Sequence, residues 1–205
     1  MDAMGVCVWA MVELEADDAL CSAAAVAMDD VGVGQVIIHT PDKDLAQCVV
    51  GERVVQRDQR KGVTIDEAGV VARFGVAPVS VPDWLALVGD SADGFPGLKG
   101  WGKTAASTVL RRYPHLEVIP RLGERWEVDV RGARSLANAL REHWDLALIF
   151  RDLATLRVDR SLLPSVDGLR WRGPRGTFEE ICQRLRAPSL AERAQRLAAE
   201  RLGRA

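Results

Sequence analysis

The sequence predicts an α/β domain followed by a helical region. Short apolar runs of strand length alternate with helix-like segments up to about residue 80, and mainly helical periodicity follows. The chain has 205 residues, of which 48% are hydrophobic and 27% are charged, so it is long enough to bury a sizeable core. We therefore expect one domain, or one domain with a small appendage.

The expected strands lie in the first part of the chain. Residues 6–9 have the pattern of a buried strand, and residues 16–28 that of an Ala-rich helix whose acidic first turn suits the helix dipole. Residues 35–39 form a second short apolar run. Residues 54–55 and 63–65, separated by a polar turn, predict a β-hairpin. Functional sites of open α/β sheets form at the carboxyl edge of such strands.

The remaining segments predict helices. Asp66 or Thr64 is expected to cap a helix that ends near Gly75. Ser80 and Asp83 have the spacing of a capping box at the start of the next helix. The later helices are expected over residues 80–88, 104–112, 133–150 and 178–202.

Composition excludes several classes of protein. Lys plus Arg (27) nearly balance Asp plus Glu (29), so the chain does not coat nucleic acid by overall charge. Four widely spaced cysteines indicate neither a zinc site nor a disulfide framework. The apolar segment 4–12 is too short to span a bilayer and lacks a basic flank, so we expect no membrane association and a cytoplasmic protein.

Three short clusters of carboxylates are the strongest functional signal. They are Glu15, Asp17 and Asp18; Asp42 and Asp44; and Asp90 and Asp93. Mg²⁺ takes oxygen ligands, and a two-ion site beside a phosphodiester needs carboxylates from separate elements. Each cluster also has a structural alternative, as acids at a helix N-terminus, caps of a loop or turn formers. Lys43, between two of these acids, is interpreted as a solvated turn lysine.

A glycine-rich segment, residues 97–104, follows the third cluster. A glycine turn that enters a helix presents backbone N–H groups to phosphate. The segment also satisfies the P-loop pattern, so a P-loop nucleotide triphosphatase is an alternative from another class. A P-loop follows a buried strand, however, whereas residues 89–96 are polar and acidic. We therefore favour a helix, a glycine hairpin and a second helix, with Trp101 packed beneath the hairpin.

Together, these motifs resemble those of the bacterial 5′-3′ exonuclease and flap endonuclease family, which includes the 5′-nuclease part of DNA polymerase I. The motifs are Glu-Ala-Asp-Asp-Ala (15–19), Thr-Pro-Asp-Lys-Asp-Leu-Ala-Gln (40–47) and Gly-Asp-Ser-Ala-Asp-Gly-Phe-Pro-Gly (89–97), with a further likeness at Trp-Asp-Leu-Ala (144–147). The resemblance implies a partial PIN-like parallel-sheet nuclease core over residues 1–79. It also implies a helix-hairpin-helix-like DNA-binding region over residues 80–165 and C-terminal helices over residues 166–205.

The resemblance further implies hydrolysis of DNA with two Mg²⁺ or Mn²⁺ ions. All seven carboxylates match the family's metal ligands or the acids around them, and Asp17, Asp42 and Asp90 are the expected catalytic set. The residues expected to bind the DNA backbone are Gly97, Lys99, Gly100, Gly102, Lys103 and Thr104. Several family members also bind K⁺ at this hairpin. The substrate would be DNA with a 5′ end or flap, held through its backbone by a monomer.

Two departures from the family pattern qualify these expectations. Lys103 directly follows Gly102, whereas one residue usually separates the last glycine from the lysine. Family members also begin with an apolar strand ending in Asp, a second Asp and a helical arch, and none of these precedes Met1. On this basis we expect an incomplete metal site. Both a fragment with reduced activity and a non-catalytic DNA-binding paralogue remain open.

Overall fold

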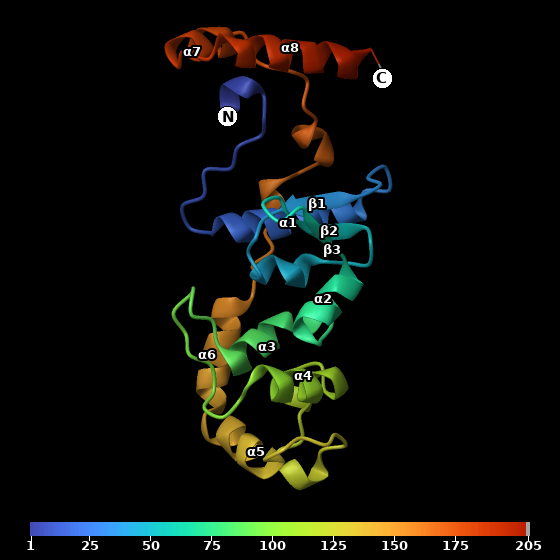
Figure 1. Ribbon diagram of the computed structural model, residues 1–205, viewed down its shortest axis with the longest axis vertical. Helices are drawn as coiled ribbons and strands as arrows, with labels where there is room; N and C mark the ends of the chain where they lie inside the picture. The colour runs from blue at the N-terminus through green and yellow to red at the C-terminus, as the bar shows by residue number, and fades with distance from the viewer. Residues whose placement is uncertain (204–205) are drawn as a thin grey trace.

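The computed structural model describes residues 1–203, and the molecule is elongated (Figure 1). A small sheet and α1 lie in the middle, helices α2 to α6 lie towards one end, and α7 and α8 lie at the other end beside the N-terminus. The last two residues of the expected C-terminal part lie outside the described residues. The expected order of an α/β portion and then helices is confirmed.

The regular elements follow one another along the chain as listed here. The helices and strands are α1 (Ala16–Asp29), β1 (Val36–His39), β2 (Val54–Asp58), β3 (Val63–Ile65), α2 (Glu67–Phe74), α3 (Val81–Val88), α4 (Lys103–Arg112), α5 (Ala133–Glu142), α6 (Trp144–Ala154), α7 (Phe178–Arg184) and α8 (Pro188–Leu202). The short 3₁₀ turns are η1 (Asp2–Met4), η2 (Asp44–Cys48), η3 (Pro78–Ser80), η4 (Leu116–Val118), η5 (Gly123–Arg125), η6 (Arg160–Leu162) and η7 (Val166–Leu169).

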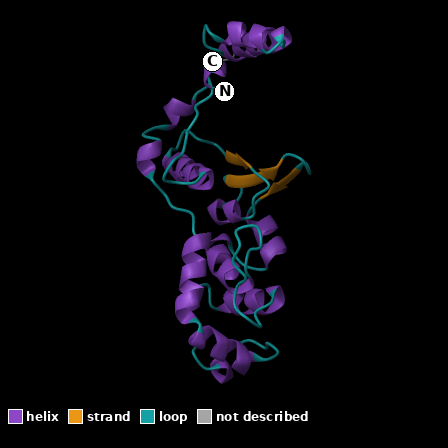
Figure 2. Ribbon diagram, turned by 90° about the vertical axis from the view of Figure 1, so that its left-hand side faces the viewer, coloured by secondary structure: helices purple, strands orange, loops and turns teal. Residues whose placement is uncertain are grey.

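The sheet has three strands in the order β1-β2-β3, and it is mixed (Figure 2). β1 and β2 are parallel, with Val36 opposite Val54, whereas β2 and β3 are antiparallel, with Gln56 opposite Ile65. The predicted hairpin is therefore confirmed, and the expected parallel arrangement holds for one pair of strands only. The parallel pair places the loop after β1 beside β2, which is the edge where the second carboxylate cluster lies.

The strand predicted over residues 6–9 is wrong. These residues form an extended connection without regular hydrogen-bonded pairing in the described part of the chain, and Cys7 and Val8 are exposed. The segment runs from the end of the molecule that holds α7 and α8 to the start of α1 (Figure 1). An apolar run becomes a strand only where a neighbouring strand can take up its backbone groups.

One predicted helix cap is confirmed and another is wrong. Asp66 caps α2 by accepting the Gly69 N–H at 2.8 Å, and Gly75 ends that helix in the left-handed region at φ 74°. The capping box predicted for α3 is wrong, because the Ser80 side chain makes no capping hydrogen bond. Asp83 instead faces inward and is 2% exposed.

Both long helices predicted in the second half of the chain are broken in two. His143 separates α5 from α6, and residues 185–187, where Arg186 has φ 53°, separate α7 from α8. Apolar residues recur at helical spacing on both sides of the first break, although the two helices bury their apolar faces against different partners. α5 packs on η5, whereas α6 packs on α3.

The buried side chains form three cores. The largest joins α2 to α6 around Leu85 and Leu110, and a smaller one joins α1 to the sheet through Ala24 and Ile38. The third is a small cluster at the far end, in which η1 packs on α7 and α8. The side chains of this third core are Phe178, Cys182, Ala191 and Ala194, with Ala3 and Met4 against them.

Two exclusions drawn from composition can be compared with the structure. All four cysteines are free thiols, as predicted. Among residues 1–203, no single helix is both long and apolar enough to cross a membrane. By length and composition alone, one bent pair passes that test, made of Glu67–Phe74 and Pro78–Val88 at 43°.

Candidate metal centre

Three of the seven predicted carboxylates meet in one place. Asp44 comes from η2, directly after the loop that leaves β1, while Asp90 and Asp93 come from the turn after α3. One oxygen of each lies within 4.8 Å of an oxygen of the other two. Segments almost 50 residues apart in the sequence thus bring their carboxylates to one point, which suits an oxygen-liganded divalent cation.

The loop that carries Asp44 is fixed by hydrogen bonds at the edge of the sheet. The Thr40 hydroxyl accepts the Asp42 N–H at 3.1 Å, and the Asp42 carboxylate accepts the Asp44 N–H at 3.1 Å. From β2, the buried Gln56 amide donates to the carbonyl oxygens of Thr40 and Asp42. These bonds orient Asp44 before any cation binds.

The turn that carries Asp90 and Asp93 is closed by backbone pairing. Asp90 and Phe95 exchange N–H to O hydrogen bonds of 2.8 and 3.0 Å, so the residues between them fold back. Gly89 (φ 90°) and Gly97 (φ 71°) allow the end of α3 to cross this turn, since a Cβ on either would lie 2.4 Å from backbone atoms. Gly97 is buried by this crossing, so its glycine is required by packing.

Burial and like charge raise the affinity of the cluster for protons. The pKa of Asp44 is raised to about 7, first by burial and then by the nearby charges of Asp42 and Asp93, although Lys43 opposes the shift. Burial, followed by Asp42, also raises the pKa of Asp17 at the start of α1. Asp44 Oδ1 is buried and has no hydrogen-bond partner among residues 1–203. A divalent cation fits this chemistry, because it would satisfy that oxygen and offset the repulsion.

Lys43 occupies the cluster, so its interpretation as a solvated turn lysine is wrong. Its ammonium forms an ion pair with Asp90 and lies 3.9 Å from Asp44 Oδ1, and its side chain is 26% exposed. Burial opposes the charge of Lys43, but the hydrogen bond with Asp90 and the charges of Asp44, Asp90 and Asp93 together outweigh burial and raise the pKa of the lysine. At Asp90, burial acts to raise the pKa of the carboxyl group. Lys43 and the Ala92 N–H outweigh burial, so the pKa of Asp90 is lowered. The ammonium supplies positive charge where a metal ion would supply it.

The other predicted ligands lie outside this three-carboxylate cluster. Asp18 is 7% exposed, and its two oxygens accept the N–H groups of Glu15 at 3.0 Å and Arg157 at 2.8 Å. Asp18 therefore caps α1 and fastens the chain after α6 to that helix. Of the expected catalytic set, only Asp90 belongs to the cluster, while Asp17 and Asp42 act on it through charge.

The predicted DNA-binding residues lie at the hairpin before α4. Except for the buried Gly97, they are exposed: Lys99, Gly100, Gly102, Lys103 and Thr104. Gly102 is the residue before α4, and a Cβ there would meet no atom within 4 Å. The first N–H groups of an α-helix have no acceptor inside the helix, so this end remains available to an anion. Trp101 is buried, as predicted.

A groove connects the hairpin helix with the carboxylates. The groove has a volume of about 860 Å³, and its lining includes Lys43 and Asp90 together with Arg73 and Lys103.

 Cationic side chains of three elements thus line the same groove as Asp90 of the carboxylate cluster. Sequence reasoning missed Arg73 because an arginine in the last turn of a helix has no distinguishing pattern.

The P-loop alternative is not supported by this geometry. The residues before Gly97 form a turn closed by the Asp90–Phe95 bridge, not the buried strand that a P-loop requires. Within residues 1–203, the residues grouped closely enough to hold a metal ion are the carboxylates Asp44, Asp90 and Asp93.

The fold and the cluster define an α/β protein with a helical region and a cluster of three carboxylates of the kind that can hold a metal ion. Two family models match the chain: the N-terminal resolvase-like domain of 5′-3′ exonucleases over residues 1–75, and the C-terminal SAM fold of 5′-3′ exonucleases over residues 76–177. The chain therefore belongs to the 5′-3′ exonuclease family, as its motifs predicted.

Curated relatives of the chain are named as enzymes of this family. The chain is 35% identical over 177 residues to DNA polymerase I of Pseudomonas aeruginosa, covering 82% of this chain and 18% of the relative. It is 34% identical over 140 residues to the 5′-3′ exonuclease of Aquifex aeolicus (68% and 45%) and 30% identical over 177 residues to flap endonuclease Xni of Yersinia enterocolitica (82% and 64%). The chain thus spans less than two thirds of the length of each of these relatives.

Solved structures support the fold. The T5 5′-exonuclease with bound divalent zinc ions has a TM-score of 0.56 to this chain at 20% identity, covering 78% of this chain and 57% of that one. A T5 flap endonuclease in a complex with DNA and metal ions has a TM-score of 0.55 at 15% identity, covering 77% and 55%.

Proposed function

We propose that this chain binds divalent metal through Asp44, Asp90 and Asp93 and hydrolyses phosphodiester bonds in DNA at a 5′ end or flap. The observation that carries the proposal is the convergence of these three carboxylates, of which the Oδ1 atom of Asp44 is buried and has no hydrogen-bond partner among residues 1–203. Membership of a family whose relatives are named as 5′-3′ exonucleases and flap endonucleases supports the same reaction.

The proposal includes two ions, Mg²⁺ or Mn²⁺. Bound ions of this kind neutralise the phosphodiester and lower the pKa of a bound water. We assign Asp90 and Asp93 to one ion, and Asp44 with Asp17 and Asp42 to the neighbourhood of the other. Glu15 and Asp18 would support the second group, and the hydrogen bonds of Asp18 to two backbone N–H groups favour an indirect part for it.

The groove gives a path for the DNA backbone. Lys103 and Arg73 line it together with Asp90, so a phosphate backbone in the groove would lie against positive charge close to the carboxylates. The exposed N-terminus of α4 would hold a phosphate of the duplex, with K⁺ at the hairpin as in several family members. Contacts of this kind read the backbone and not the bases.

The same proposal covers the organisation of the chain. We assign residues 1–79 to part of a PIN-like nuclease core, residues 80–165 to a helix-hairpin-helix-like DNA-binding region and residues 166–205 to C-terminal helices. The arrangement of α3, the glycine turn and α4 supports the second assignment. A monomer is sufficient, since the groove and the cluster lie on one chain.

A cleavage assay tests the function. On a labelled 5′-flap substrate, the chain should release product with Mg²⁺ and none with EDTA, and Asp90→Asn should lower the rate on the order of 100-fold because a ligand charge is lost. Asp152→Asn, a change at an exposed position of α6, is the matched control and should keep the wild-type rate.

Two outcomes would change the conclusion. Cleavage by Asp90→Asn at the wild-type rate would show that the cluster is not the active site. Binding of the flap without any Mg²⁺-dependent product would instead identify a non-catalytic DNA-binding paralogue.

A further inference from the structure

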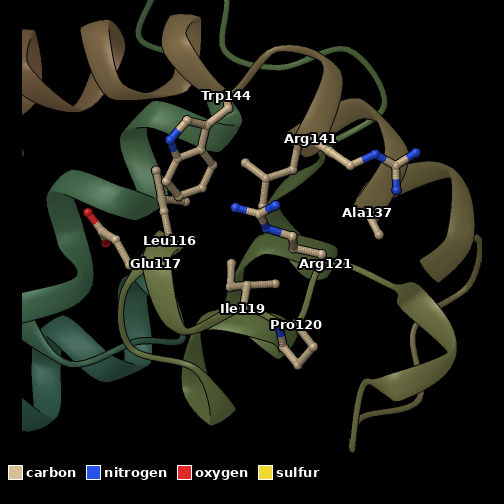
Figure 3. A pocket seen from close by; sticks show the side chains of 9 residues that line it. Leu116, Glu117, Ile119, Pro120, Arg121, Ala137, Arg141 and Trp144 are labelled. Carbon is tan, nitrogen blue, oxygen red and sulfur yellow. The ribbon is translucent and has the colours of Figure 1, made fainter.

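A second cavity lies in the helical region, apart from the groove and the carboxylates. It has a volume of about 420 Å³ and lies between the segment 116–121 and the helices α5 and α6 (Figure 3). Leu116, Ile119 and Leu140 give it an aliphatic lining, and the indole of Trp144 forms one side. It shares no lining residue with the groove that leads to the metal centre.

The charge of this cavity is positive and uncompensated. Glu117, its one acid, is paired with Arg151 at 2.6 Å. Arg121, by contrast, makes no hydrogen bond or ion pair within residues 1–203, and Figure 3 shows its guanidinium between Ile119 and Trp144. Arg141, on the side of Ala137, donates to the side-chain oxygen of Asn138 only, at 3.0 Å. Arg121 thus holds the guanidinium group that faces the cavity, whereas that of Arg141 points away from it (Figure 3).

The lining indicates which anion would fit. Guanidinium groups bind carboxylates with two parallel hydrogen bonds, and the aliphatic lining favours a hydrocarbon or phenyl group beside that carboxylate. A nucleobase fits less well, because its polar edge would be buried against Leu and Ile side chains without hydrogen-bond partners. The ligand chemistry is therefore an apolar group next to a carboxylate.

The surface around the cavity favours a peptide over a small molecule. Val118 and Leu122, which belong to or flank the segment that forms one wall, are 53% and 45% exposed. A ligand that continued beyond the cavity would cover these apolar side chains, whereas a small acid would leave them in water. We propose that this cavity binds the end of a partner protein's chain, with a bulky apolar last residue inside and its terminal carboxylate on Arg121.

A peptide titration tests the proposal. The probe is the hexapeptide acetyl-Gly-Ser-Gly-Ser-Leu-Phe with a free carboxyl end, and the readout is the indole N–H signal of Trp144 in the ¹H–¹⁵N spectrum, assigned through Trp144→Phe. We expect saturable binding with a Kd on the order of 0.1–1 mM. The same peptide with an amidated end should bind about 10-fold more weakly, because the charge-assisted hydrogen bonds are lost.

Variants separate the guanidinium group of Arg121 from general effects of charge. Arg121→Met should weaken binding about 10-fold, and Arg121→Lys should fall between it and the wild type, since lysine keeps the charge but not the two-point geometry. Arg134→Met is the matched control, because Arg134 lies on α5, is 77% exposed and pairs with Glu124. The control should bind as the wild type does, and each variant's spectrum reports whether it is folded.

Three results would overturn the proposal. They are the absence of any shift at 5 mM peptide, a concentration about five times the weakest expected Kd, equal binding of the acid and the amide, and unchanged binding by Arg121→Met. A Trp144 shift caused by a short DNA duplex and not by the peptide, and weakened in Arg121→Met, would instead assign Arg121 to DNA.

Discussion

Two buried aspartates at opposite ends of α3 differ in how completely they are paired. Asp83, in the first turn, is 2% exposed and contacts His115 Nδ1 at 3.0 Å, the Leu116 N–H at 3.3 Å and Arg151 at 3.2 Å. Asp90, just beyond the last turn, is 3% exposed and lies against two other carboxylates with Lys43 as its cationic partner. A carboxylate that the protein pairs completely is structural, whereas a group of carboxylates left with unpaired oxygens is prepared for a cation.

The largest effect is expected from Asp83→Ala. Without this carboxylate, the Leu116 N–H and the Arg151 guanidinium would lose a buried partner. Breaking a buried pair in this way costs about 3–5 kcal/mol of the free energy of unfolding, which urea denaturation measures. Asp152→Ala on the exposed side of α6 should change that free energy by less than about 0.5 kcal/mol. If Asp83→Ala lowered the free energy of unfolding by less than about 1 kcal/mol, the interpretation of Asp83 as a structural carboxylate would be contradicted.

Metal binding comes next in size. At a Mn²⁺ concentration 100 times its Kd, the folded state should gain about 2.7 kcal/mol, seen as a higher Tm. Asp44→Asn should remove most of this gain, since it neutralises the ligand whose oxygen has no other partner. An unchanged Tm of the wild-type chain in millimolar Mn²⁺ would contradict the metal site.

The raised pKa of Asp44 gives this metal effect a pH dependence. Because the folded-state pKa of about 7 lies above the unfolded value, protonation of Asp44 stabilises the metal-free protein fully below about pH 4. That contribution is lost as the pH rises through about 7. Metal competes with the proton, so its affinity should increase up to about pH 7 and then level off, and this step should be absent in Asp44→Asn.

The smallest effect is expected from Lys43→Met. Losing the ammonium leaves the carboxylates without a resident counter-charge, so the metal-free protein should be destabilised by about 1 kcal/mol. The same change removes a competitor from the site, and Mn²⁺ should bind several-fold more tightly in a titration followed by calorimetry. Lys61→Met, at an exposed lysine paired with Asp58, should leave Mn²⁺ affinity unchanged. Weaker Mn²⁺ binding by Lys43→Met would mean that the lysine supports the metal instead of replacing it.

The sequence was sufficient to predict elements that depend on local pattern. The helix at residues 16–28, the hairpin over β2 and β3 and the Asp66 cap are confirmed, because each depends on neighbouring residues in the chain. The carboxylate motifs predicted the family and the general position of the site. Which acids meet could not be predicted, because the geometry of Asp44, Asp90 and Asp93 depends on how β1 and α3 pack.

The wrong predictions share a physical cause. Residues 6–9 are apolar enough for a strand, but a strand also needs a neighbour that the pattern does not reveal. Asp83 has the spacing of a capping residue, yet its partners are 32 to 68 residues away in the sequence. Lys43 was assigned to solvent because nothing in its local sequence shows that Asp90 lies beside it. Each error concerns a contact between distant segments.

The contact between the two ends of the chain has a consequence for the order of folding. The Trp171 indole donates to the Met4 carbonyl oxygen at 2.7 Å, and the Arg175 N–H donates to the Ala3 carbonyl oxygen at 2.9 Å. These partners are 167 residues apart in the first case, so closing that loop from an unfolded chain costs about 2.5 kcal/mol more than closing a 10-residue loop. The intervening helices and sheet shorten the effective loop only once they have formed. The contact of η1 with α7 should therefore form late, and its amide hydrogens should be among the first to exchange with solvent.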